Sequence, residues 1–183
     1  MRKIAEHRKF EHINDYFVYE EKSDVRHEYY SENLFEMAAS TKLHNQIVFY
    51  VTLLFRQLLL HKKFDISSEQ VKVFIKSENI FFYPDVMIAL PEQQEYFASY
   101  PILIAEVFSE NSRKFDLVDK FLHYQKIETL QYYLLIEPEK HLLIFYIKTD
   151  DEDWETHTYT AANDVINLPK FNISIALKDI YQF

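Results

Sequence analysis

Hydrophobic side chains recur along this chain with two spacings, one typical of helices and one typical of strands. Helical spacing is clearest from His44 to about His61, where one apolar stripe carries Ile47, Val51, Leu54 and Leu58. Residues three and four apart share a helix face, so this stripe should face a core. Ser40 or Thr41 stands where an N-cap residue is expected. The stretch therefore predicts an amphipathic helix.

Strand-like alternation and short apolar runs fill much of the remaining chain. Residues 71–76 and 80–90 read as paired strands joined by a polar turn at 77–79, a pattern typical of a hairpin. Residues 27–40 alternate in part and predict a second hairpin, which turns around Ser31, Glu32 and Asn33.

A second helix is expected after Ser109, and three strands follow it, at 131–138, 141–149 and 154–160. Residues 165–183 predict a short strand and a terminal helical turn, whereas residues 1–24 predict an N-terminal helix or arm. Strands on both sides of a core helix, with another helix in front, favour an α+β or mixed α/β sheet domain. The length allows one proper core, so we expect a single domain over residues 1–183.

Two of the apolar runs each contain one carboxylate, Asp85 and Glu106. Burying an unpaired carboxylate costs several kcal/mol, so each acid needs a partner. One explanation is an ion pair, and another is a divalent cation held between the two acids, because hard cations take oxygen ligands. Pro84 removes a backbone donor and predicts a strand edge, strand start or bend beside Asp85.

The predicted helix after Ser109 carries an apolar stripe and a polar one. The apolar stripe consists of Leu117, Val118, Phe121 and Leu122. Asp116, Lys120 and Tyr124 are four residues apart and share another side. An acid four residues before a base is an ordinary surface pair on a helix, so spacing alone leaves Asp116 and Lys120 as solvent-facing partners.

Composition narrows the class of protein. Hydrophobic residues make up 48% of the chain and aromatic residues 17%, as in a globular domain. There is no cysteine, which excludes disulfides and thiolate metal sites. The first residues are charged throughout, unlike a signal peptide, and the apolar runs are far shorter than the roughly 20 residues of a membrane span. We therefore expect a cytoplasmic protein with no membrane partner.

The chain has a net charge of −9 and contains no glycine. Phosphate-binding loops of the P-loop and dinucleotide types require glycine for close backbone approach, so those nucleotide-binding classes are excluded. Acidic balance is unusual for a duplex-binding protein, because neutralising phosphates supplies much of the affinity. A local basic patch can coexist with acidic metal ligands.

The order of these polar residues resembles the Uma-type restriction endonuclease family within the PD-(D/E)XK nuclease superfamily. The residues that carry the resemblance are Pro84-Asp85, Glu106-Val107-Phe108-Ser109, Ser112-Arg113, Asp116, Lys120 and Tyr124. The resemblance implies a restriction-endonuclease-like core, in which a central mixed β-sheet is flanked by helices. It also implies hydrolysis of phosphodiester bonds, with DNA as the expected substrate.

The resemblance assigns roles to three residues. Asp85 and Glu106 would bind Mg²⁺ or Mn²⁺, and Lys120 would activate or orient water. One position departs from the superfamily, because Phe108 stands where a lysine is expected two residues after the acid. The family pattern implies that Lys120, from the following helix, supplies the amine instead.

Four more residues are implied as supporting members of the site: Glu28, His44, Asp116 and Tyr124. Glu28 matches the first acid of a family hairpin whose other residues are replaced here by Ser31, Glu32 and Asn33. His44 lies at the start of the first helix, where it could equally be a histidine hydrogen-bonded at a helix end.

Three functions remain open from the sequence. The leading one is a metal-dependent endonuclease, and the alternative is a catalytically silent nuclease-fold module that binds or regulates. A two-carboxylate glycosidase is disfavoured, because Arg113, Lys114 and Lys120 suit a phosphate better than a sugar. The 14 tyrosines and 16 phenylalanines exceed what one small core readily hides, so we expect a homodimer.

Overall fold

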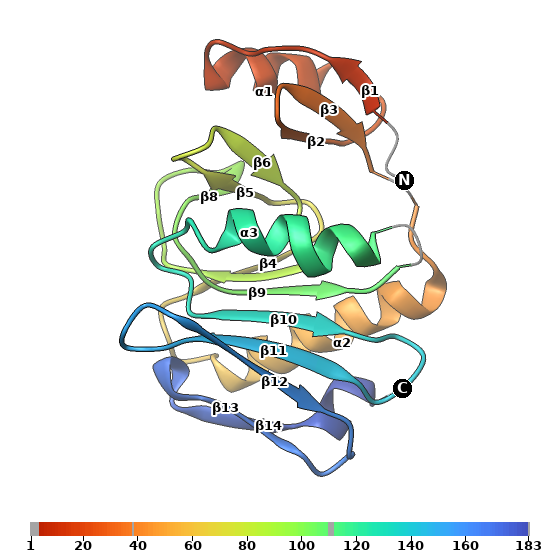
Figure 1. Ribbon diagram of the computed structural model, residues 1–183, viewed down its shortest axis with the longest axis vertical. Helices are drawn as coiled ribbons and strands as arrows, with labels where there is room; N and C mark the ends of the chain where they lie inside the picture. The colour runs from red at the N-terminus through yellow and green to blue at the C-terminus, as the bar shows by residue number, and fades with distance from the viewer. Residues whose placement is uncertain (1–3, 38, 110–111, 183) are drawn as a thin grey trace.

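The computed structural model describes residues 4–37, 39–109 and 112–182 and is built around a mixed six-stranded sheet (Figure 1). Its strand order is β12-β11-β10-β9-β7-β4. Only β9 and β10 are parallel among these neighbours, and every other pair is antiparallel. The strands are β4 (Asp65–Ser68), β7 (Val86–Ala89), β9 (Pro101–Val107), β10 (Tyr132–Ile136), β11 (Leu143–Lys148) and β12 (Trp154–Tyr159).

A second sheet carries the N-terminal part of the chain, in the order β1-β3-β2-β6-β5-β8. Helix α1 (Ile13–Glu21) packs on it through Tyr16, which is 1% exposed and stacks on Phe81. The predicted N-terminal arm is therefore a strand and a packed helix. The strands are β1 (Ile4–His7), β2 (His27–Tyr30), β3 (Asn33–Glu36), β5 (Lys72–Ile75), β6 (Ile80–Phe82) and β8 (Phe97–Ala98).

Helix α2 (Lys42–Leu58) covers one face of the central sheet with Ile47, Val51 and Leu54 of its predicted stripe, whereas Leu58 is 37% exposed. Thr41 is its N-cap, because its hydroxyl accepts a hydrogen bond from the amide of His44 at 3.2 Å. The rest of this layer is the hairpin of β13 (Val165–Leu168) and β14 (Ile173–Ala176), with the 3-10 helices η2 (Pro169–Phe171) and η3 (Leu177–Tyr181).

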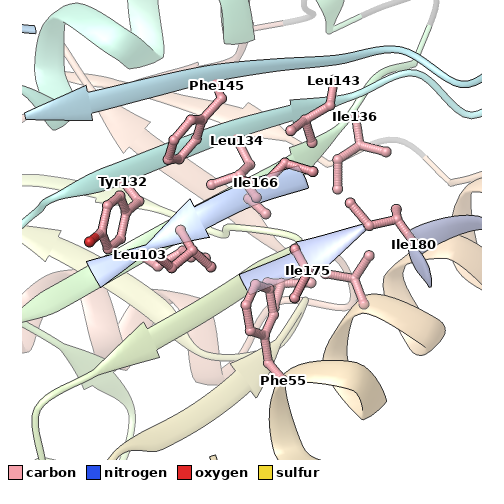
Figure 2. Packing of buried hydrophobic residues seen from close by; sticks show 14 of the residues in the cluster. Phe55, Leu103, Tyr132, Leu134, Ile136, Leu143, Phe145, Ile166, Ile175 and Ile180 are labelled. Carbon is pink, nitrogen blue, oxygen red and sulfur yellow. The ribbon is translucent and has the colours of Figure 1, made fainter. Parts of the chain in front are cut away.

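The largest cluster of buried side chains lies between the central sheet and this layer. Figure 2 shows residues of β9, β10 and β11 meeting Ile166 and Ile175 from the C-terminal hairpin, Ile180 from η3 and Phe55 from α2. Leu103, which belongs to β9, has no exposed surface. Apolar burial of this kind is the main favourable term in folding, at roughly 25 cal/mol per Å². The cluster fixes α2 and β9 relative to each other.

The opposite face of the central sheet is covered by a π-helical turn, η1 (Phe115–Lys120), which continues into the short helix α3 (Phe121–Tyr124) (Figure 1). Strand alternation sends Leu103, Ala105 and Val107 towards α2. Ile104 and Glu106 point the other way, towards η1 and α3. Short π-helical segments are frequent at functional sites.

The orientation of this second helix differs from the apolar-stripe prediction. Val118 and Leu122 are 48% and 55% exposed, although both belong to the predicted core stripe. Asp116, Lys120 and Tyr124 lie inward instead and are 2%, 5% and 0% exposed. The polar side faces the protein because Glu106 projects towards it and needs partners. The prediction from spacing alone, that Asp116 and Lys120 are solvent-facing partners, is therefore wrong.

The predicted strand over residues 80–90 is two strands that belong to different sheets. Residues 80–82 form β6, which pairs with β5 around the turn predicted at 77–79. The chain then bends at Pro84, and β7 joins the central sheet between β4 and β9. Strand β4 was not predicted. The bend places Asp85 at the junction of the two sheets.

The hairpin around Ser31 and Glu32 is confirmed by the antiparallel pairing of β2 and β3. Both residues have positive φ, 51° and 56°, as a two-residue type I′ turn requires. Because neither residue is glycine, each of these positive-φ conformations costs on the order of 1 kcal/mol. Across the described residues, no helix is both long enough and apolar enough to cross a membrane.

Candidate active site

Asp85 directly precedes β7 and contacts the end of β9, the strand that contains Glu106. Its Oδ2 accepts a hydrogen bond from the amide of Val107 at 2.7 Å, at the end of β9. Its own amide donates to Oε2 of Glu106 at 3.4 Å. The start of β7 and the end of β9 are thus held together by reciprocal bonds, and Asp85 and Glu106 lie side by side.

Glu106 is almost fully enclosed, with 2% of its surface exposed. Its Oε1 accepts hydrogen bonds from Lys120 Nζ and from the Tyr124 hydroxyl, both at 2.9 Å. Burial raises the pKa of Glu106 well above its ordinary value, and the ammonium of Lys120 opposes this rise. The charges of Asp85 and Asp116 raise that pKa further. Glu106 is therefore a carboxylate whose ionised form depends on nearby cations.

Lys120 is enclosed by three carboxylates. Its Nζ lies 2.9 Å from Glu106, 3.2 Å from Glu28 and 3.5 Å from Asp116. The Glu106 contact is a hydrogen bond, whereas the Asp116 oxygen at 3.5 Å is an ion-pair neighbour without a hydrogen bond of its own among the described residues. Lys120 itself is 5% exposed. The geometry makes it the counter-ion of a buried acidic cluster, in direct contact with Glu106.

Glu28 and Asp116 reach Lys120 from different elements. Glu28 belongs to β2, and its Oε1 also accepts the amide of Tyr83, two residues before Asp85. Asp116 belongs to η1, whose backbone is fixed by the Tyr133 hydroxyl donating to the Asp116 carbonyl at 2.9 Å. Burial raises the pKa of the Asp116 carboxyl, while Lys120 opposes the rise. Both acids therefore belong to one network with Glu106.

His44 approaches Asp85 from the first turn of α2. Its Nε2 lies 3.2 Å from Asp85 Oδ1. Burial alone would lower the pKa of His44, but the hydrogen bond and charge of Asp85, together with Glu69, raise it. The histidine is thus more than a satisfied group at a helix end, because it contacts the acid at the centre of the site.

Glu69 is the member of this site that the sequence reasoning missed. His44, Glu69 and Asp85 each offer a ligand atom, and these atoms all lie within 4.8 Å of one another. Glu69 follows β4, which was not predicted, and no motif marks it. The only available signal was an acid in a turn after a short alternating segment.

The charge of the cluster fits a bound cation. Three carboxylates, those of Glu28, Glu106 and Asp116, lie around the ammonium of Lys120. A fourth acid, Asp85, lies beside Glu106. Carboxylate oxygens and one imidazole are donors that Mg²⁺ or Mn²⁺ accepts. The side chain of Asp85 is 16% exposed, more than those of Glu28, Glu106 and Asp116. The described residues therefore suit a divalent ion at Asp85.

Comparison with known proteins identifies a family for the chain. The sequence model of the Uma2 family, described as "Putative restriction endonuclease", matches residues 13–178. Two uncharacterized proteins of Synechocystis sp. are similar over most of the chain. The protein slr1290 is 29% identical over 171 residues, which cover 92% of this chain and 90% of the relative. The protein sll1609 is 28% identical over 145 residues, or 76% and 82% of the two chains.

A solved structure shares the fold. It is described as "a putative nuclease belonging to DUF820" from Anabaena variabilis, and it superposes with a TM-score of 0.73. The match covers 91% of this chain and 96% of that chain, at 15% sequence identity. The expected mixed α+β architecture of a nuclease fold is thereby confirmed.

Proposed function

The chain belongs to the Uma2 family, and we propose from its site that it is a metal-dependent endonuclease that hydrolyses phosphodiester bonds of DNA. The observation that carries the proposal is the meeting of Asp85, Glu106 and Lys120 from three separate elements. Family membership supports the nuclease class. The acids and the amine are the residue types that phosphodiester hydrolysis with a metal requires.

The metal would be Mg²⁺ or Mn²⁺, with Asp85 as its central ligand. Glu106 is the second acid of the family pattern, and His44 and Glu69 are additional donors beside Asp85. When bound, the ion would lower the pKa of a water molecule and offset charge on the phosphate. His44 must be neutral at Nε2 to coordinate, so binding would release a proton from a histidine whose pKa is raised.

Lys120 and Tyr124 stabilise the ionised form of Glu106 that metal binding requires. Their two hydrogen bonds to Oε1 favour the ionised carboxylate, and Oε2 accepts a hydrogen bond from the backbone amide of Asp85. Lys120 is proposed to orient the attacking water or to offset developing negative charge, the function that a lysine two residues after the acid serves in the superfamily. Glu28 and Asp116 fix the position of its ammonium.

Nuclease assays test the proposal directly. Supercoiled plasmid and a linear duplex, incubated with Mg²⁺ or Mn²⁺, should be cut by the wild-type protein and left intact in EDTA. Asp85→Asn should lose at least about a hundredfold in rate, since the central ligand is removed. Cutting by Asp85→Asn at the wild-type rate would contradict the proposal.

A catalytically silent nuclease-fold module is the second candidate. The observation that favours it is the enclosure of Lys120 among three carboxylates, with only 6% of its side chain exposed to a substrate. In that case the protein would bind metal and DNA without cutting. Plasmid left intact in every metal, together with retained DNA binding, would select this function.

A homodimer is part of the proposal. Phe49 and Leu53 are 62% and 39% exposed and share the outer face of α2, a surface that a second copy could cover. Two sites related by a two-fold axis would suit cutting both strands of a duplex. Light scattering at increasing concentration should give a dimer mass, and Phe49→Ser should shift it towards the monomer.

A further inference from the structure

Phe108 occupies the position where the superfamily has its lysine, and its ring supports a different cation. The ring is buried, with 2% exposure. The guanidinium carbon of Arg113 lies 4.3 Å from the ring centroid. Cations over an aromatic face are attracted by the ring quadrupole, and arginine stacks there more often than lysine.

Arg113 is held at the same edge of the sheet as the acidic cluster. Its guanidinium pairs with the carboxylate of Glu137, just after β10. Its amide donates to the Ser109 carbonyl at 3.1 Å. Phe108 directly follows Val107, whose amide holds Asp85. The stacking ring therefore belongs to the residue next to the one whose amide positions the central acid.

Arg113 differs from Lys120 in its access to solvent. The side chain of Arg113 is 43% exposed, whereas that of Lys120 is 6% exposed. A polyanion approaching Asp85 meets four carboxylates and one enclosed ammonium, so a solvent-facing cation is needed to attract it. The guanidinium has five donors in a planar fork that matches the oxygens of a phosphate. With one face on Phe108 and one edge on Glu137, its remaining edge can meet that ligand.

We propose that Arg113, stacked on Phe108, binds a phosphate of the DNA backbone next to the bond that is cut. This inference rests on the proposed function and adds the residue that positions the substrate. Glu137 holds the guanidinium in place in the free protein and competes with the phosphate for it. The simpler alternative makes the pair a structural tie between the end of β10 and the start of η1.

The experiment measures binding of a fluorescein-labelled DNA duplex by fluorescence anisotropy in EDTA, where cleavage is absent. Arg113→Ala should weaken binding by about ten- to a hundredfold, the equivalent of one charge-assisted contact. It should also reduce the slope of log K against log salt by about 0.9, as expected for one lost phosphate contact. Arg113→Lys should keep the slope and recover only part of the affinity.

Two variants separate phosphate binding from a structural tie. Glu137→Gln removes the competitor, so it should bind the duplex as tightly as wild type or more tightly. Under the structural alternative, it should weaken binding as Arg113→Ala does. Lys63→Ala is the charge-matched control, since Lys63 is exposed and follows the C-terminus of α2, whereas His44 lies in the first turn of that helix. Melting temperatures would show that each variant is folded.

The proposal is overturned if wild type does not bind the duplex or if Arg113→Ala binds it as tightly as wild type does. It is also overturned if Glu137→Gln or Lys63→Ala loses as much affinity for the duplex as Arg113→Ala loses. Its failure is distinct from failure of the proposed function. Plasmid left uncut with metal, together with binding that depends on Arg113, would reject the nuclease and keep the phosphate site. Plasmid cutting that does not depend on Arg113 would keep the nuclease function and reject the phosphate site.

Discussion

Replacing Lys120 with methionine removes its ammonium from the acidic cluster while keeping a similar side-chain volume. Carboxylates of three residues lie 2.9 to 3.5 Å from its Nζ. Without it, Glu28, Glu106 and Asp116 would be buried without their common cation. Breaking a buried pair by removing one partner costs about 3–5 kcal/mol.

The cost of protonating one of these acids is the upper limit of that loss in unfolding free energy. A glutamate with an ordinary pKa of about 4.3 takes up a proton at pH 7 at a cost of roughly 3.7 kcal/mol, and at pH 5 at a cost of about 1 kcal/mol. If one acid of the cluster is neutralised in Lys120→Met, the free energy of unfolding should fall by about 4 kcal/mol at pH 7. The loss should shrink to about 1 kcal/mol at pH 5.

Thermal and urea denaturation of metal-free protein at both pH values would measure this loss. For a chain of this size, about 4 kcal/mol corresponds to a melting temperature lower by roughly 8–16 °C. Lys114→Met is the matched control, because Lys114 is exposed on the same segment, and it should change stability by about 0.5 kcal/mol or less. A loss below about 1 kcal/mol at pH 7, or a loss independent of pH, would refute the reasoning.

Three further predictions concern the same cluster. Glu106→Gln should abolish cleavage while leaving the melting temperature unchanged or higher, because it removes one of four carboxylates; a clear drop in melting temperature would contradict this. In metal-free buffer, the unfolding free energy of wild type should decrease from about pH 5 to about pH 8. The pKa values of Glu106 and His44 are raised in the folded state. Stability is therefore lost as the pH rises through these folded-state pKa values. Urea titrations showing the opposite slope would refute it. Phe108→Lys, which restores the superfamily spacing, should destabilise the protein by about 3 kcal/mol or more without raising activity, because it buries an ammonium in an apolar cluster; calorimetry and a plasmid assay would check both.

Much of the fold follows from local patterns. Helix α2 and its Thr41 cap are visible in the sequence because apolar spacing and capping chemistry are local. The hairpins are visible because polar turns separate alternating segments. Strand β4 is not visible, since its four residues are polar or half-buried and acquire their role only by pairing with β7.

The site is less accessible to local reasoning. The order of Asp85, Glu106 and Lys120 indicates a nuclease-like group only through family resemblance, because spacing alone makes Lys120 a surface residue. Its burial depends on Glu106 projecting from β9 and on Glu28 arriving from the second sheet. The contribution of Glu69 depends on β4 and on the packing of α2, neither of which a motif records.

Isothermal titration of metal-free protein with Mn²⁺ tests the central claim most directly. Wild type should bind about one equivalent, with affinity that rises with pH as His44 loses its proton. Asp85→Ala should lose binding, because its carboxylate lies with His44 and Glu69 in one group of candidate ligands. Glu155→Ala, at an exposed acid of β12, should bind as wild type does. Unchanged Mn²⁺ binding by folded Asp85→Ala, or no binding by wild type, would contradict the account.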